Sequence, residues 1–108
     1  MTINLKRFNG RYIVTADGKN YTFAHSLKAL EFVFDVKSYG VAYTCEVYEK
    51  LACMHHLGIL KAQDTRADMV RQMLLDLKSG ILMDNAIRGV ITRDYTLDQL
   101  LIRKGYAQ

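Results

Sequence analysis

Two turn dipeptides near the start of the chain, Asn9-Gly10 and Asp17-Gly18, constrain the fold more than any other feature of the sequence. Both residues of such a pair tolerate a positive φ, which the favoured two-residue turns of β-hairpins require. The segments that the dipeptides separate are rich in β-branched and aromatic residues. They predict a three-stranded antiparallel meander with strands over 3–8, 11–15 and 20–24.

After residue 25 the apolar residues recur at helical spacing, and glycines mark the places where helices end. The expected helices are 27–38 with Ser26 as N-cap, 42–57 ended by Gly58, one from the capping-box pair Thr65 and Asp68 to Gly80, and one from the pair Thr96 and Gln99 to Gly105. The segment 81–91 is either a short helix ending near Gly89 or a buried extended run, and we favour the helix. The sequence therefore predicts an α+β fold, an N-terminal meander followed by four or five helices.

We predict that residues 1–108 form one domain, with the β-meander in 1–25 and a helical part in 26–108. The chain has the length of a single domain, and 50% of its residues are hydrophobic and 24% are charged, as in ordinary globular proteins. Charges interrupt the apolar stretches before the roughly 18 residues that a membrane span requires, and the N-terminus has no apolar signal core. We therefore expect a cytoplasmic protein without a membrane partner.

The cysteines are the residues from which catalysis or metal binding could most readily be built. Cys45 and Cys53 fall on one predicted helix, too far apart to bridge at a rise of about 1.5 Å per residue, so we expect free thiols in a reducing compartment. Cys53 shares a polar face with Glu49 and His56, which suggests a thiolate, an orienting carboxylate and a base, and makes a Cys-dependent enzyme one alternative. We predict instead that the chain is not an enzyme and holds no metal or cofactor, because an oxyanion site and a second pair of zinc ligands are missing.

The whole chain has a formal net charge of +4, and its positive charge is concentrated near the N-terminus. Residues 1–25 contain a single acid, Asp17, and four cations: Lys6, Arg7, Arg11 and Lys19. The strands interleave these cations with aromatic residues, and over residues 3–38 the order of three strands and a helix resembles, in topology, the arm-binding domains of tyrosine recombinases. The runner-up hypothesis, ahead of the Cys-dependent enzyme, is therefore nucleic-acid binding, with the four cations contacting phosphates.

The first predicted helix has apolar residues on more than one face. The residues that recur at helical spacing and are expected to face the core are Leu27, Leu30, Val33 and Phe34. Phe32 and Tyr39 are aligned with one another towards the other side of the helix. Because aromatic residues are enriched where proteins bind partners, we predict that Phe32 and Tyr39 form a docking patch.

The leading functional hypothesis is a small non-enzymatic binding protein, an adaptor, regulator or inhibitor that docks on a larger protein. The sequence contains no dinucleotide-binding, P-loop or nucleophile-elbow fingerprint. Chains of this size without such motifs commonly act by covering a surface, and small inhibitors encoded by mobile genetic elements fit that description. A homo-oligomer is compatible with the same surplus of apolar surface.

Overall fold

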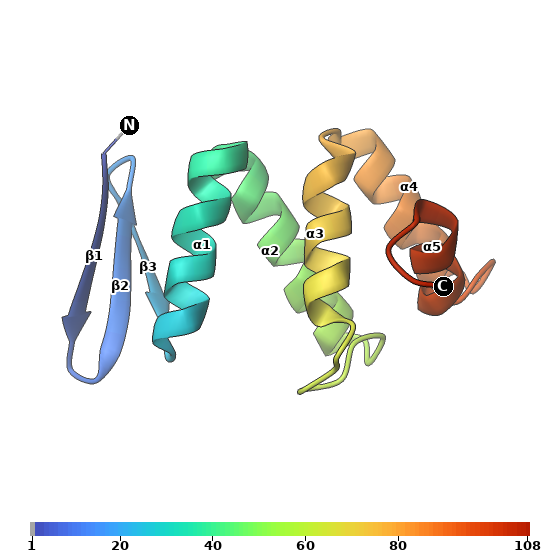
Figure 1. Ribbon diagram of the computed structural model, residues 1–108, viewed down its shortest axis with the longest axis horizontal. Coiled ribbons are helices and arrows are strands. Elements are labelled where there is room, and N and C mark those ends of the chain that lie inside the picture. Colours follow the sequence, from blue (N-terminus) through green and yellow to red (C-terminus); the bar gives the residue numbers. More distant parts are fainter. Residues whose placement is uncertain (1) are drawn as a thin grey trace. The chain divides into compact units, whose positions relative to one another are not determined.

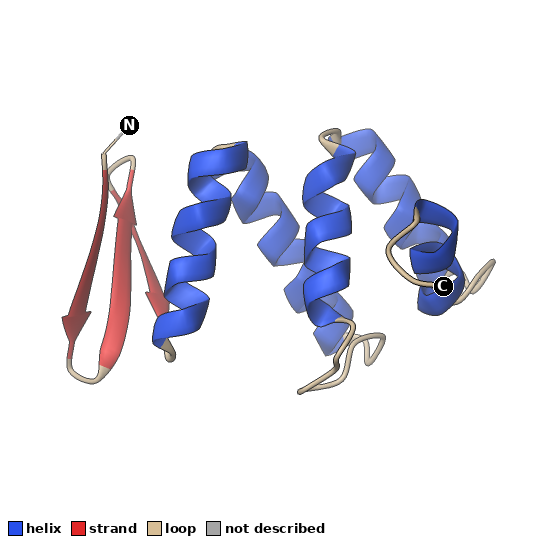
Figure 2. Ribbon diagram, in the orientation of Figure 1, coloured by secondary structure: helices blue, strands red, loops and turns tan. Residues whose placement is uncertain are grey.

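The computed structural model describes residues 2–108 and begins with an antiparallel sheet (Figure 1). The strands, in the spatial order β1-β2-β3, are β1 (Ile3–Phe8), β2 (Arg11–Ala16) and β3 (Lys19–Phe23). The helices that follow are α1 (Ser26–Tyr39), α2 (Val41–His56), α3 (Ala67–Leu77), α4 (Gly80–Ile91) and α5 (Leu97–Lys104). In Figure 2 the strands (red) all precede the helices (blue) along the chain. The predicted α+β fold is confirmed, and the ambiguous segment 81–91 is helical.

Both predicted hairpin turns have the backbone that the dipeptides favour. The φ angles are 51° at Asn9 and 74° at Gly10, and 50° at Asp17 and 78° at Gly18. Positive φ at both positions lets the flanking strands keep their right-handed twist while they pair. The first hairpin then brings Phe8 opposite Arg11, and the second brings Ala16 opposite Lys19.

The helix ends are partly as predicted. Thr96 and Gln99 form the expected capping box at the start of α5, and Gly105 follows its end with a φ of 87°. The predicted capping box at Thr65 and Asp68 is wrong, because α3 begins at Ala67 and no side chain caps it. Gly80 does not end α3 as predicted: α3 ends before Lys78, which has a φ of 53°, and Gly80 is the first residue of α4. Ser26 is not the N-cap of α1 as predicted, because it lies inside the helix and His25 is the N-cap. None of the helices within residues 2–108 is both long enough and apolar enough to cross a lipid bilayer.

The chain divides into two compact units, one extending to Thr44 and the other running from Cys45 to Gln108. The division falls inside α2, so α1 belongs with the sheet rather than with the later helices. The boundary expected after residue 25 marks only the change from strands to helices. That the two units act as one domain stays a prediction.

In the first unit, α1 covers one face of the sheet (Figure 1). Val14 and Ala16, on the sheet face towards the helix, are fully buried. The ring of Phe32 lies with its centroid 4.9 Å from that of Tyr21 and 5.1 Å from that of Phe23. Tilted ring pairs at such distances add to the stability gained from apolar burial, so these aromatic residues fix which side of α1 faces the sheet.

The second unit is built around α3, α4 and α5, each of which contacts the other two. Its fully or almost fully buried apolar side chains include Val70, Met73, Leu74, Leu75, Met83, Leu100 and Leu101. The loop before α3 is held by Asp64, which accepts hydrogen bonds from the backbone N–H of Arg66 at 2.9 Å and from its guanidinium at 2.7 Å. Arg66 also reaches Asp98 in α5 at 3.0 Å, so this arginine ties the loop to the last helix.

The hydrogen bonds from Arg66 hold the pKa of Asp64 well below its usual range, and the same bonds raise the pKa of Arg66. A carboxylate with a lowered pKa stabilises the folded state above its unfolded pKa of about 3.9, and this contribution is lost as the pH falls below that value. We expect Asp64→Asn to lower stability at pH 7 and to make the free energy of unfolding depend less on pH below about pH 4. Urea denaturation at pH 7 and at a series of pH values below about 4 measures both effects.

Asp98→Asn is the matched control for Asp64→Asn, because Asp98 contacts the same guanidinium but its side chain is 67% exposed, against 8% for Asp64. An exposed partner contributes little, since water and salt screen the interaction. We expect a much smaller change for Asp98→Asn. Equal acid profiles for wild type and Asp64→Asn would contradict the assignment.

Candidate binding surfaces

The solvent side of α1 carries a strip of exposed apolar side chains. Leu27, Leu30 and Phe34 leave 73%, 52% and 67% of their surface exposed. Their spacing, i, i+3 and i+7, places them on one side of a helix, one above the other. Lys28 and Glu31 form an ion pair at 3.5 Å on the same helix. We call Leu27, Leu30 and Phe34 the α1 strip.

The predicted orientation of α1 is wrong. Leu27, Leu30 and Phe34 were expected to face the core, but they point to solvent, and of that set only Val33 is half-buried. The residues that α1 buries are instead Ala29, Phe32, Asp35 and Val36. Both sides of the helix are apolar enough to be buried, and the aromatic rings of β3 select the side that includes Phe32.

The structure places the two residues of the predicted docking patch away from the α1 strip. Phe32 is only 2% exposed and packs against Tyr21 and Phe23, so it is a core residue of the first unit. Its ring covers a sheet face that would otherwise leave two aromatic side chains in water. Tyr39 is half-buried at the end of α1. An accessible apolar surface on this helix therefore lies on the opposite side from Phe32.

The face of the sheet turned away from α1 is open. The strand register pairs Lys6 with Ile13, Phe8 with Arg11, and Ile13 with Thr22, and directly paired residues share a face. Phe8 is 60% exposed, Lys6, Arg11 and Thr22 are exposed, and Ile13 is half-buried. We call Lys6, Phe8, Arg11, Ile13 and Thr22 the open sheet face.

The four cations proposed for phosphate contacts are divided between the two faces of the sheet. Lys6 and Arg11 lie on the open sheet face, whereas Arg7 pairs with Tyr12, and Lys19 pairs with Ala16, on the face that α1 covers. The guanidinium of Arg7 lies 6.0 Å from the centroid of the Tyr12 ring, within range of a cation–π interaction. All four are exposed. They do not form a single patch, and two of them could contact a ligand that lies on the open face.

The polar cluster predicted on α2 is exposed along its length. Glu49, Cys53 and His56 are all at the surface, and within residues 2–108 no group of three His, Cys, Asp or Glu side chains is placed to hold a metal ion. Lys50, beside them, donates to Asp84 at 3.0 Å, and this hydrogen bond raises the pKa of Lys50. His55 donates from Nδ1 to the Leu60 carbonyl at 3.1 Å.

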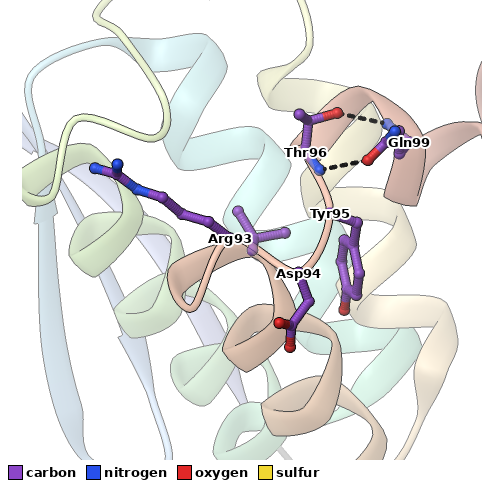
Figure 3. Close-up of a pocket in the computed structure, with 6 residues that line it drawn as sticks. Arg93, Asp94, Tyr95, Thr96 and Gln99 are labelled. Atoms are coloured by element: carbon purple, nitrogen blue, oxygen red, sulfur yellow. Dashed lines mark hydrogen bonds between the residues drawn. The ribbon is translucent and has the colours of Figure 1, made fainter.

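A shallow hollow beside the connection from α4 to α5 was not predicted (Figure 3). It is lined by Val90, Arg93, Asp94, Tyr95, Thr96 and Gln99. Figure 3 shows the paired hydrogen bonds between Thr96 and Gln99, and the side chain of Arg93 extending away from the Tyr95 ring. The Tyr95 hydroxyl donates to the Ala86 carbonyl at 2.7 Å, and its ring lies directly against Gly89. The hydrogen bond and the ring contact of Tyr95 hold the connection against α4, so we assign the residues of this hollow a structural role.

Gly89 is the sequence signal for this contact, but the predicted end of the helix near Gly89 is wrong. In the structure α4 continues through Gly89 to Ile91, and the missing side chain makes room for the Tyr95 ring. A glycine inside a helix lowers its stability, so its presence there indicates a close approach by another group. The sequence alone does not say which residue approaches.

The chain matches no model of a known protein family, and neither a curated protein nor a solved structure is significantly similar to it.

Proposed function

We propose that this protein is a non-enzymatic binding protein that docks on a larger protein through the α1 strip. The observation that carries the proposal is that α1 is apolar on both sides and that the fold buries only one of them. An apolar side of a helix normally faces a core or a partner rather than water. Leu27, Leu30 and Phe34 therefore mark the side that a partner would cover.

The spacing of the α1 strip favours a partner with an apolar groove. Helices that insert into grooves anchor themselves through side chains at i, i+3, i+4 and i+7, and the α1 strip supplies i, i+3 and i+7. A groove buries each anchoring side chain on several sides. A second copy of α1 would cover the strip from one direction only, and one helix of 14 residues, about 21 Å long, offers little area for a stable dimer. The ion pair of Lys28 and Glu31 would lie at the polar rim.

Charge substitution in the α1 strip tests the proposal. We expect Leu30→Asp to abolish co-purification of a stoichiometric partner from the native cell. A carboxylate buried without a partner in the interface would cost at least about 2 kcal/mol of binding free energy. The thermal unfolding midpoint should change by no more than a few degrees, since Leu30 is 52% exposed.

Leu82→Asp is the matched control, because it is the same substitution at a leucine that is 51% exposed in α4. This variant should retain the partner. Three outcomes would overturn the proposal. Both variants keep the partner, both variants lose it, or sedimentation shows that the wild type pairs only with itself through the strip.

A further inference from the structure

We propose that the open sheet face is a binding site for single-stranded nucleic acid, with Lys6 and Arg11 contacting phosphates and Phe8 stacking on a base. This inference is independent of the docking function, because it concerns the other side of the first unit. It replaces the expectation that all four N-terminal cations act together.

The strand register brings the three side chains together. Phe8 and Arg11 are directly paired across the first hairpin, and Lys6 lies on β1 two positions before Phe8, on the same face. Adjacent strands are about 4.8 Å apart, so a ring and two cations occupy a small area of one pleated surface. The ring is 60% exposed, which is unusual for a phenylalanine and leaves its face available for stacking.

The charge of this surface is of one sign. The strands β1, β2 and β3 contain no acidic residue, and the only acid up to residue 25, Asp17, lies in a turn. Arg11 and Lys6 therefore have no carboxylate opposite them in the sheet to which they could bind. A polyanion is the ligand whose charge complements such a surface.

The exposed ring favours a single strand over a duplex. Aromatic side chains on a positively charged surface bind single strands by stacking on bases, with little dependence on sequence, because every base has a π-face. The bases of a duplex are already stacked on one another, so a duplex could use the two cations but not the ring. Thr22 and Ile13 are directly paired and extend the same face beside these three side chains.

The matched test compares two double variants that remove the same charge from opposite faces of the sheet. Binding of the full chain to a fluorescein-labelled oligothymidylate of about 16 nucleotides is followed by fluorescence anisotropy over a range of salt concentrations. We expect Lys6→Gln with Arg11→Gln to reduce the slope of log Kobs against log salt by about 1.4, because each phosphate contact with a single strand contributes about 0.7. Arg7→Gln with Lys19→Gln should leave the slope unchanged.

Phe8→Ala tests the stacking contact separately from charge. It should weaken oligothymidylate binding about tenfold at every salt concentration and leave the slope unchanged. Circular dichroism should show wild-type folding for all these variants, since the substituted side chains are exposed. Leu30→Asp in the α1 strip should bind the oligonucleotide as the wild type does, which separates this site from the docking function.

Several results would overturn the assignment. These are an absence of binding at low salt, equal losses for the two double variants, which would indicate only long-range attraction by net charge, and tighter binding of a duplex of the same length. Unchanged binding by Phe8→Ala would remove the stacking contact and with it the preference for single strands.

Discussion

Phe32→Ala is expected to lower the free energy of unfolding by about 3–5 kcal/mol, the cost of removing a large aromatic side chain from a core. The Phe32 ring is 2% exposed and lies within 5.1 Å, between centroids, of both Tyr21 and Phe23. Its removal leaves a cavity between α1 and the sheet and exposes two further rings. Urea denaturation of the full chain, followed by circular dichroism, measures the effect.

Phe34→Ala is the control, at the same residue type and two positions away on the same helix. Because Phe34 is 67% exposed, its removal should change stability by no more than about 0.5 kcal/mol. If Phe34→Ala were the more damaging substitution, α1 would be turned the other way and the α1 strip would be part of the core.

Gly89→Ala is expected to lower the free energy of unfolding by about 1–3 kcal/mol, because the added methyl group would overlap the Tyr95 ring. A displaced ring would lose the hydrogen bond that its hydroxyl donates to the Ala86 carbonyl, and its contact with the Arg103 guanidinium, which lies 5.3 Å from the ring centroid. The overlap is with the rigid ring rather than with the end of a flexible chain.

The sign of the effect should reverse when the ring is absent. In a Tyr95→Ala background, Gly89→Ala should stabilise the protein by up to about 1 kcal/mol, because alanine is the better helix former. A double-mutant cycle from thermal or urea unfolding gives the coupling between the two positions. Equal costs in both backgrounds would show that the Tyr95 ring does not lie against Gly89.

The features that could be predicted from the sequence are those fixed by local chemistry. Asn9-Gly10 and Asp17-Gly18 determine their turns, because only a few residue types adopt two consecutive positive φ angles. The pair Thr96 and Gln99 caps α5 by bonds between neighbours in the chain. In these cases the interacting groups are a few residues apart, so the sequence contains the whole interaction.

The orientation of α1 could not be predicted in the same way. Its apolar residues recur at helical spacing on two sides, one with Leu27, Leu30 and Phe34 and the other with Phe32 and Val36. Periodicity identifies each side as suitable for burial but does not rank them. The choice depends on the rings of Tyr21 and Phe23, which belong to another element. The predicted docking patch therefore includes Phe32, which packs against the sheet.

The candidate surfaces were partly accessible from the sequence. Alternation along a strand is enough to place Arg11 and Ile13 on one side of β2. The division of the four cations into two pairs depends on the register that joins β1 to β2 and β2 to β3. Similarly, Gly89 indicated a special position in α4, whereas its partner Tyr95 follows from the path of the connection to α5. Long-range pairing is the information that was missing in both cases.

Photo-crosslinking from α1 tests the docking function most directly. A photoreactive residue is placed in turn at positions 27, 30 and 34 of the α1 strip and, as a control, at position 81, where Ile81 is 75% exposed at the start of α4. We predict that all three strip positions capture the same partner in the native cell, that the crosslinked peptides map to one groove of that partner, and that position 81 does not capture it. Capture from position 81 alone, or crosslinks only to a second copy of this chain, would contradict the proposal.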